Sequence, residues 1–281
     1  MFSASPWFVT VTCVCVLVVC GVRLQAQGRA GQAAPPQTAK AIAPIDLTGY
    51  WTAVVTEDWH VRMLTPAKGD FGSGVAGTIE NPGVGFIGAG PNPSDRGNIP
   101  YNVTGAKLAM AWDPAKDEAE GNACKAYGAP GIMRLPTHLH ITWQDENTLK
   151  IEADYGNATL FPARPAKLEA PAGTEPSSQG YSIAQWTVMG GAGGFERGGN
   201  LRVATSRLKP GYYWKNGMPY TANVAMTEYF RTMELPDRSQ WIRYTQIVDD
   251  PEYLTQPWIV NYAFKKLPDG SKWNPTPCSA R

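Results

Sequence analysis

Nine short runs of alternating polar and apolar residues constrain the fold of this chain more than any other feature of its sequence. The runs are rich in β-branched and aromatic residues, which is typical of half-buried β-strands. Glycine and proline, with 29 and 24 copies, supply turns between them, and such short connections favour antiparallel neighbours. The predicted strands cover residues 48–55, 58–64, 137–143, 148–155, 182–189, 201–208, 225–233, 241–248 and 258–266, with a tenth candidate at 157–161.

A meander of nine or ten strands has to hide the hydrogen-bonding edges of its outermost strands. We therefore predict a mainly β fold in which residues 46–281 form one antiparallel, up-and-down, lipocalin-like barrel, with a β-sandwich as the alternative. One or two short helices are expected, at 104–112, where Thr104 would cap the first turn, and at 115–120. The Gly- and Pro-rich stretch 65–101 has no periodic run and is predicted to form a flap over one barrel mouth.

The N-terminus has the pattern of a secretory signal. Residues 8–22 form an uncharged, mostly apolar segment that is shorter than the roughly 20 residues needed to cross a bilayer. We predict that residues 1–26 are a signal peptide and that residues 27–45 are a flexible linker, with a retained membrane anchor as the alternative. The mature chain would be periplasmic or extracellular in a bacterium, with no membrane span after cleavage.

Export would leave two of the five cysteines in the mature chain, because Cys13, Cys15 and Cys20 lie within the predicted signal. An even pair in an oxidising compartment favours a disulfide. We therefore predict a bond between Cys124 and Cys278, which would tie the C-terminus to the middle of the chain. Two free thiols are the alternative.

The charge balance and the missing motifs exclude several functional classes. The chain has 25 Lys and Arg against 24 Asp and Glu, and this net charge of +1 argues against nucleic acid as a partner. It contains no G-x-S-x-G, C-x-x-C, H-E-x-x-H or Walker pattern. The sequence GVGFIG at 83–88 matches G-x-G-x-x-G but lacks the flanking strand and helix of a dinucleotide site. We therefore expect no cofactor, apart from the zinc alternative below.

The three histidines give the clearest chemical signal. His138 and His140 are two residues apart in a predicted strand, so their side chains point to one face. The next predicted strand carries Glu152 and Asp154 with the same spacing. Matching the apolar faces of the two strands leaves a three-residue loop at 146–148 and places His140 opposite Asp154.

Three interpretations of the histidines and their neighbouring carboxylates are open. The first is a solvated outer face. The second is a zinc site of His60, His138 and His140, with a free fourth coordination position. The third is acid–base catalysis in a barrel cavity, where a carboxylate fixes the tautomer of a histidine. In this third case the candidate catalytic residues share one wall of the barrel: Asp58, His60, His138, His140, Glu152 and Asp154.

Four further residues are candidate ligand contacts. Arg62 follows the same alternation as the histidine in its strand and could bind an anion. Glu228 alternates with apolar residues, so it is expected to point inward, where an ion pair with an arginine would satisfy its charge. The aromatic residues Trp59 and Tyr229 could contact a planar or apolar ligand.

Four segments share a pattern with known proteins: CKAYGAPGIMRLP, SQGYSIAQW, MTEYFR and DDPEYLTQPW. Through them the chain resembles a broad group of secreted, largely uncharacterised bacterial proteins, over roughly residues 48–278. The resemblance implies an exported, lipocalin-like β-structure and brings no reaction with it. The matching positions are Cys124, Gly128, Met133, Gly180, Ser182, Trp186, Thr227, Glu228, Phe230, Asp250, Pro251, Thr255, Pro257 and Trp258.

These features together predict an exported β-barrel that binds a small, partly apolar organic molecule. If the protein is an enzyme, we expect cofactor-free proton-transfer chemistry of the lyase, isomerase, cyclase or hydratase type, because the chain has histidines and carboxylates at same-face spacing and no nucleophile or nucleotide motif. The alternatives are a ligand carrier or envelope protein without turnover, and a zinc enzyme.

Overall fold

In the computed structural model, the described part of the chain comprises residues 37–55, 68, 99–156, 158–160, 170–189 and 198–280. These residues belong to one compact unit, Gln37–Arg281. Strands account for 42% of them and helices for 12%, so the predicted mainly β fold is confirmed. The predicted signal peptide, the predicted strand at 58–64 and most of the predicted flap at 65–101 lie outside the described residues.

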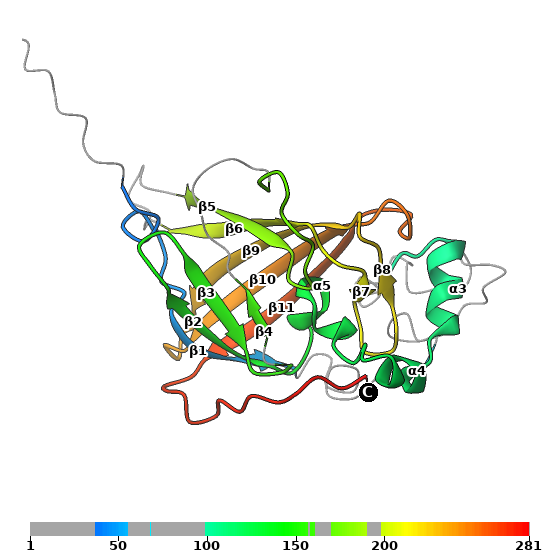
Figure 1. Cartoon of the computed structure of the whole chain (residues 1–281). Helices are drawn as coiled ribbons and strands as arrows, with labels where there is room; N and C mark the ends of the chain where they lie inside the picture. Colours follow the sequence, from blue (N-terminus) through cyan, green and yellow to red (C-terminus); the bar gives the residue numbers. More distant parts are fainter. Residues whose placement is uncertain are drawn as a thin grey trace, which may run out of the picture. The chain divides into compact units, whose positions relative to one another are not determined.

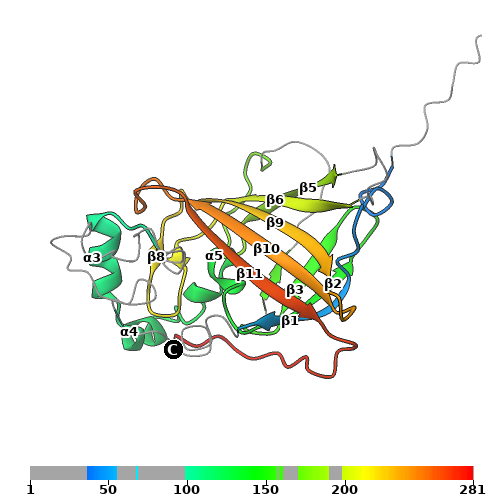
Figure 2. The same cartoon turned by 180° about the vertical axis from the view of Figure 1, so that it is seen from behind.

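Nine strands form one antiparallel sheet that curls into a nearly closed barrel (Figure 1 and Figure 2). Their order is β4-β3-β2-β1-β11-β10-β9-β6-β5, so the chain runs up and down and the first strand pairs with the last. The up-and-down prediction is confirmed, and the sandwich alternative is wrong because a single sheet supplies the whole wall. The strands are β1 Gly49–Val54, β2 His138–Trp143, β3 Leu149–Ala153, β4 Ala158–Leu160, β5 Tyr181–Met189, β6 Gly198–Ser206, β9 Ala225–Glu234, β10 Gln240–Asp249 and β11 Trp258–Lys266.

Buried and more exposed residues alternate along the strands, as predicted, and the buried ones form the core inside the barrel. In β10, for example, Ile242, Tyr244, Gln246 and Val248 are buried, and the residues between them are more exposed. Successive side chains of a strand point to opposite faces, so each strand contributes one row to the interior. The same alternation in β2 and β3 buries their leucine and isoleucine side chains and turns the polar residues outward.

Short helices lie beyond one end of the barrel, beside the small β7–β8 hairpin (Figure 1). Helix α3 spans Val103–Ala111, and its N-cap is Asn102, whose side chain accepts a hydrogen bond from Gly105 N. The prediction that Thr104 caps this helix is therefore wrong: the chain turns helical before it reaches that residue. Helix α4 spans Pro114–Ala119 and is close to its predicted position. The hairpin strands are β7 Gly211–Tyr212 and β8 Pro219–Tyr220.

One segment that the sequence analysis does not predict lies against the inner wall. It consists of a 3-10 turn at Lys125–Tyr127 and of helix α5, Ala129–Ile132, whose residues are all buried. The side-chain amide of Gln246 in β10 donates to the carbonyl oxygen of Pro130 at 3.1 Å. At Gly131 a Cβ atom would lie 2.7 Å from the carbonyl oxygen of Ala126, so glycine permits this close approach.

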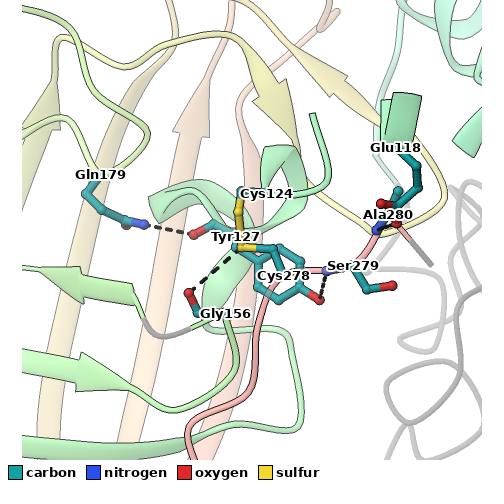
Figure 3. The surroundings of a disulfide bond; sticks show 8 residues. All are labelled: Glu118, Cys124, Tyr127, Gly156, Gln179, Cys278, Ser279 and Ala280. Atoms are coloured by element: carbon teal, nitrogen blue, oxygen red, sulfur yellow. Dashed lines mark hydrogen bonds between the residues drawn. A yellow bond between two sulfur atoms is a disulfide. The ribbon is translucent and has the colours of Figure 1, made fainter. Parts of the chain in front are cut away.

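The predicted disulfide between Cys124 and Cys278 is confirmed (Figure 3). It fixes the C-terminal tail, which is the chain after β11, to the 3-10 turn. The tail forms further hydrogen bonds after the disulfide. The backbone N of Ser279 donates to the hydroxyl of Tyr127 at 3.2 Å, and that of Ala280 donates to Glu118 Oε1 at 2.8 Å. The C-terminal tail is therefore a fixed part of the fold.

The described part of the predicted linker is packed against the β2–β3 loop. Ala39 is buried, and its backbone N donates to Asn147 Oδ1 at 3.0 Å, while Lys40 N donates to the carbonyl oxygen of Glu146. Residues 37–45 thus belong to the folded unit. Across the described ranges, no helix is both long and apolar enough to span a membrane.

Candidate functional site

Two groups of polar side chains lie on opposite faces of the same sheet. The first, called the outer cluster here, consists of His138, His140, Glu152 and Asp154 on and beside the β2–β3 hairpin. Leu139 and Ile141 of β2 are fully buried, so the histidines that alternate with them point away from the barrel interior. The prediction that both histidines share a face is confirmed, and that face is the outer one, so the prediction that they line a cavity inside the barrel is wrong.

The register of this hairpin differs from the predicted one. His140 pairs with Glu152, whereas the sequence analysis places it opposite Asp154. Backbone Gln144 N donates to the carbonyl oxygen of Thr148, so the three-residue loop is 145–147, one position earlier than predicted. Within it, Asn147 N donates to Asp145 Oδ1 at 2.7 Å, an Asx turn that favours this loop. Moving the loop by one position shifts every pair by two, which leaves the polar and apolar faces unchanged.

Asp154 partners His138, and it is buried just beyond the end of β3. Its carboxylate accepts hydrogen bonds from Thr137 Oγ1 at 3.0 Å and from His138 N at 2.8 Å. It also contacts His138 Nδ1 at 2.7 Å and accepts from the backbone N of Asn274 at 3.2 Å. Asp154 therefore orients His138 and fastens the C-terminal tail to the hairpin.

His140 has a more open environment. Its Nδ1 lies 3.2 Å from Glu152 Oε2, and the other oxygen of Glu152 is 2.8 Å from Lys150 Nζ. The imidazole stacks on Tyr50 of β1 with a centroid distance of 4.2 Å, and the edge of Trp273 in the tail contacts both rings. The side chains of His140 and Glu152 are about one quarter exposed, so this pair is accessible from solvent.

The other half of the predicted shared wall, Asp58 and His60, lies outside the described residues, as do Trp59 and Arg62. Strand β2 is paired with β1 on one edge and with β3 on the other. A further strand could therefore reach its histidines only by packing on the outer face of the sheet. In the described ranges, no three His, Cys, Asp or Glu side chains are grouped so that they could hold a metal ion. The zinc site and the shared wall both stay predictions.

The second group, called the inner-wall site here, consists of Thr205, Glu228, Tyr244 and Gln246. Glu228 points inward as predicted and is 2% exposed. Its carboxylate accepts a hydrogen bond from the hydroxyl of Tyr244 at 2.8 Å and a long one from Thr205 Oγ1 at 3.5 Å. Burial raises the pKa of Glu228 to about 7, while these two hydrogen bonds act in the opposite direction.

The predicted ion pair between Glu228 and an arginine is wrong for the part of the chain that the structure describes. The partners of the carboxylate are hydroxyl groups, and no cation contributes to its pKa. The reason lies in the alternation of the strands: Arg202 of β6 and Arg243 of β10 are not buried, and they occupy positions between inward-pointing residues. Tyr229, the other predicted contact in β9, is likewise on the outer face.

Gln246 lies directly opposite Glu228 in the β9–β10 ladder. Its Nε2 donates to the carbonyl oxygen of Pro130, which fixes the orientation of the side-chain amide. Its Oε1 is buried and has no hydrogen-bond partner among the described residues. Gln246 is not among the residues predicted from the sequence, although the alternation that places Glu228 inward applies equally to the run WIRYTQIV.

Comparisons with known proteins add no relative. No family model matches the chain, and neither does any curated protein or any solved structure. The resemblance to secreted bacterial proteins therefore stays a prediction.

Proposed function

We propose that this protein binds a small, partly apolar organic molecule inside the barrel, at the inner-wall site. One observation carries the proposal: a carboxyl group without a cation lies opposite an amide oxygen without a partner, and both are buried. Burying such groups costs free energy that a purely structural core avoids. Polar groups with perturbed pKa values in an apolar surrounding are characteristic of functional sites.

The rest of the interior supports an apolar body for the ligand. Phe230 and Phe264 are almost fully buried on the same wall, and Val203 is the neighbour of Glu228 on β6. A ligand with one or two polar atoms would satisfy Gln246 and Glu228, and its hydrocarbon part would contact these side chains.

The same site supports the enzymatic form of the proposal. A carboxyl group with a pKa near 7 can both accept and donate a proton at neutral pH, and the hydroxyl of Tyr244 holds it in place. We therefore extend the proposal to cofactor-free proton transfer of the lyase or isomerase type, with Glu228 as the acid–base group. The outer cluster is the second candidate, because the solvent-accessible His140 is held by a carboxylate in a catalytic-type pair.

Export is a separate proposal, together with membership of the secreted bacterial group. The disulfide supports it, since such bonds persist mainly in oxidising compartments. Expression of the full chain in a bacterium, followed by fractionation and N-terminal sequencing of the product, tests it. A mature N-terminus near residue 27 in the periplasm or medium is expected, whereas an uncleaved cytoplasmic chain would contradict export.

The binding proposal is tested by identifying what the protein carries. Mass spectrometry of small molecules released from purified protein supplies the ligand, which is then assayed for binding and turnover. Glu228→Gln should abolish turnover or weaken binding at least tenfold, corresponding to about 1.4 kcal/mol. Glu234→Gln is the matched control, because Glu234 lies on the same strand but is exposed.

The variants also separate the competing classes. Turnover lost in Glu228→Gln but kept in His140→Ala assigns the reaction to the inner-wall site, and the opposite pattern assigns it to the outer cluster. A ligand that is recovered unchanged from every variant identifies a carrier. A protein that carries no small molecule, and whose NMR spectrum no candidate ligand perturbs, would contradict the proposal.

A further inference from the structure

The polar atoms of the inner-wall site are not equally free to bond. The hydroxyl hydrogens of Tyr244 and Thr205 are used on Glu228, and the amide nitrogen of Gln246 donates to Pro130. While Glu228 is ionised, the groups with remaining capacity are acceptors: the unpaired Oε1 of Gln246 and the further lone pairs of the Glu228 carboxylate. A ligand that contacts these atoms has to donate hydrogen bonds.

The charge of the site points the same way. When Glu228 is ionised, its only partners among the described residues are the hydroxyls of Tyr244 and Thr205, and no basic side chain contributes to its pKa. A buried carboxylate without an opposite charge is unfavourable, and a bound cation would remove that penalty.

Aromatic rings surround the partner of this carboxylate. Tyr244 is the centre of an aromatic cluster in which its ring lies 5.0 Å from Phe230, 6.0 Å from Tyr262 and 6.5 Å from Phe264, measured between centroids. Glu228 is hydrogen-bonded to the central ring of this cluster. Aromatic faces attract organic cations, and ammonium-binding sites commonly combine such rings with a carboxylate.

We infer that the inner-wall site selects a small organic cation, an ammonium group carried on an apolar body. The inference rests on the proposed function and names the chemical class of its ligand. The ammonium hydrogens would bond to Glu228 and Gln246, while the apolar body would lie against the aromatic cluster of Phe230, Tyr244, Tyr262 and Phe264.

The test compares matched probes on the folded protein. Isothermal titration calorimetry measures the Kd of primary amines, from butylamine to 2-phenylethylamine, and of the alcohol of the same shape as each amine. At about pH 8.5, where primary amines are still mostly protonated, the best amine should bind at least about tenfold more tightly than its alcohol. Glu228→Gln should remove this preference, and Glu234→Gln should retain it.

The pH dependence gives a second readout. The groups that face Glu228 are Tyr244 and Gln246 from β10 and Thr205 from β6, with the hydroxyl of Ser182 from β5 behind Thr205. Of these only Tyr244 titrates, and burial raises its pKa well above its ordinary value. Only the ionised carboxylate binds a cation strongly, so amine binding should weaken about thirtyfold between about pH 8.5 and about pH 5.5.

The outcomes separate this inference from the proposed function. Alcohols or other neutral probes that bind as tightly as the amines, or more tightly at low pH, would overturn the cation class and leave interior ligand binding intact. An amine preference that survives in Glu228→Gln would overturn the assignment to this site. The absence of binding by every amine at both pH values would also overturn the inference, whatever ligand is recovered from the purified protein.

Discussion

The outer cluster and the inner-wall site place carboxylates on opposite faces of one sheet, and they satisfy them in opposite ways. Asp154 on the outer side has Thr137, two nitrogens of His138 and the backbone of Asn274 around it. Glu228 on the inner side has two hydroxyls and a raised pKa. A buried acidic side chain therefore stabilises the structure at Asp154, whereas at Glu228 its hydrogen-bonding capacity is only partly used.

The difference shows where this protein departs from what stability alone would favour. Thr137 and His138 hold Asp154 within the hairpin, and Asn274 N joins it to the tail, so its hydrogen bonds are part of the fold. At the inner-wall site the unpaired Oε1 of Gln246 and the ionisable Glu228 weaken the fold, which is common at functional sites. Four predictions test this contrast.

The largest effect is expected from breaking the bond that holds the tail over the outer side. Cys278→Ser opens a disulfide between residues 154 positions apart, and the chain-entropy model gives a loss of about 5 kcal/mol in the free energy of unfolding. Urea denaturation measures this loss. Cys124→Ser and the double variant should show the same value, since all three remove one bond. A loss below about 1 kcal/mol would show that the tail contacts hold the structure without the disulfide.

The second prediction concerns Glu228 and has a defined pH dependence. Below its unfolded pKa of about 4.5 the side chain is protonated in both the folded and the unfolded state. Above that pH the unfolded state ionises first, so the folded state loses stability until the pH passes about 7. Glu228→Gln should therefore raise the free energy of unfolding by about 3 kcal/mol at about pH 8.5 and change it little at about pH 4.5.

Chemical denaturation at the two pH values measures this difference, with Glu234→Gln as the exposed control on the same strand. A stabilisation of equal size at both pH values would show that ionisation of Glu228 is not its cause. Destabilisation at high pH would contradict the description of Glu228 as an unfavourable buried charge.

The third prediction concerns Asp154 on the outer side, whose hydrogen bonds stabilise the fold. Asp154→Asn replaces an acceptor of four hydrogen bonds by an amide that can accept only some of them, and it should cost about 2 kcal/mol. Nitrogen NMR of the imidazoles should show a change of tautomer at His138 and little change at His140. An equal response of both histidines would contradict the pairing found in the structure.

The smallest effect is expected at Glu152. The side chains of Glu152, His140 and Lys150 are about one quarter to one third exposed. Ion pairs with this exposure contribute roughly 0–1 kcal/mol to the free energy of unfolding. Glu152→Gln should therefore change the free energy of unfolding by less than about 1 kcal/mol in denaturation experiments. A loss as large as that of Asp154→Asn would show that the two carboxylates of the outer cluster are equivalent, which their burial argues against.

Local sequence signals predicted most of the strands and missed the smaller elements. The runs that became β9, β10 and β11 have strict alternation and strong strand-forming residues, so their bounds agree within one residue. Helix α5 is short and carries Pro130 and Gly131, and no periodicity marks a segment of that length. Its position depends on contacts with Gln246 and with the β7–β8 hairpin, which are distant in sequence.

The sequence by itself determined which side chains share a face of a strand, because backbone geometry alone turns successive residues to opposite sides. It also indicated the disulfide, since two cysteines lie outside the predicted signal peptide. Only the tertiary structure decided that the histidines face outward and that Glu228 meets Tyr244 and Gln246 inside. Those outcomes depend on barrel closure, on hairpin register and on the path of the tail, which are set by contacts between residues far apart in the chain.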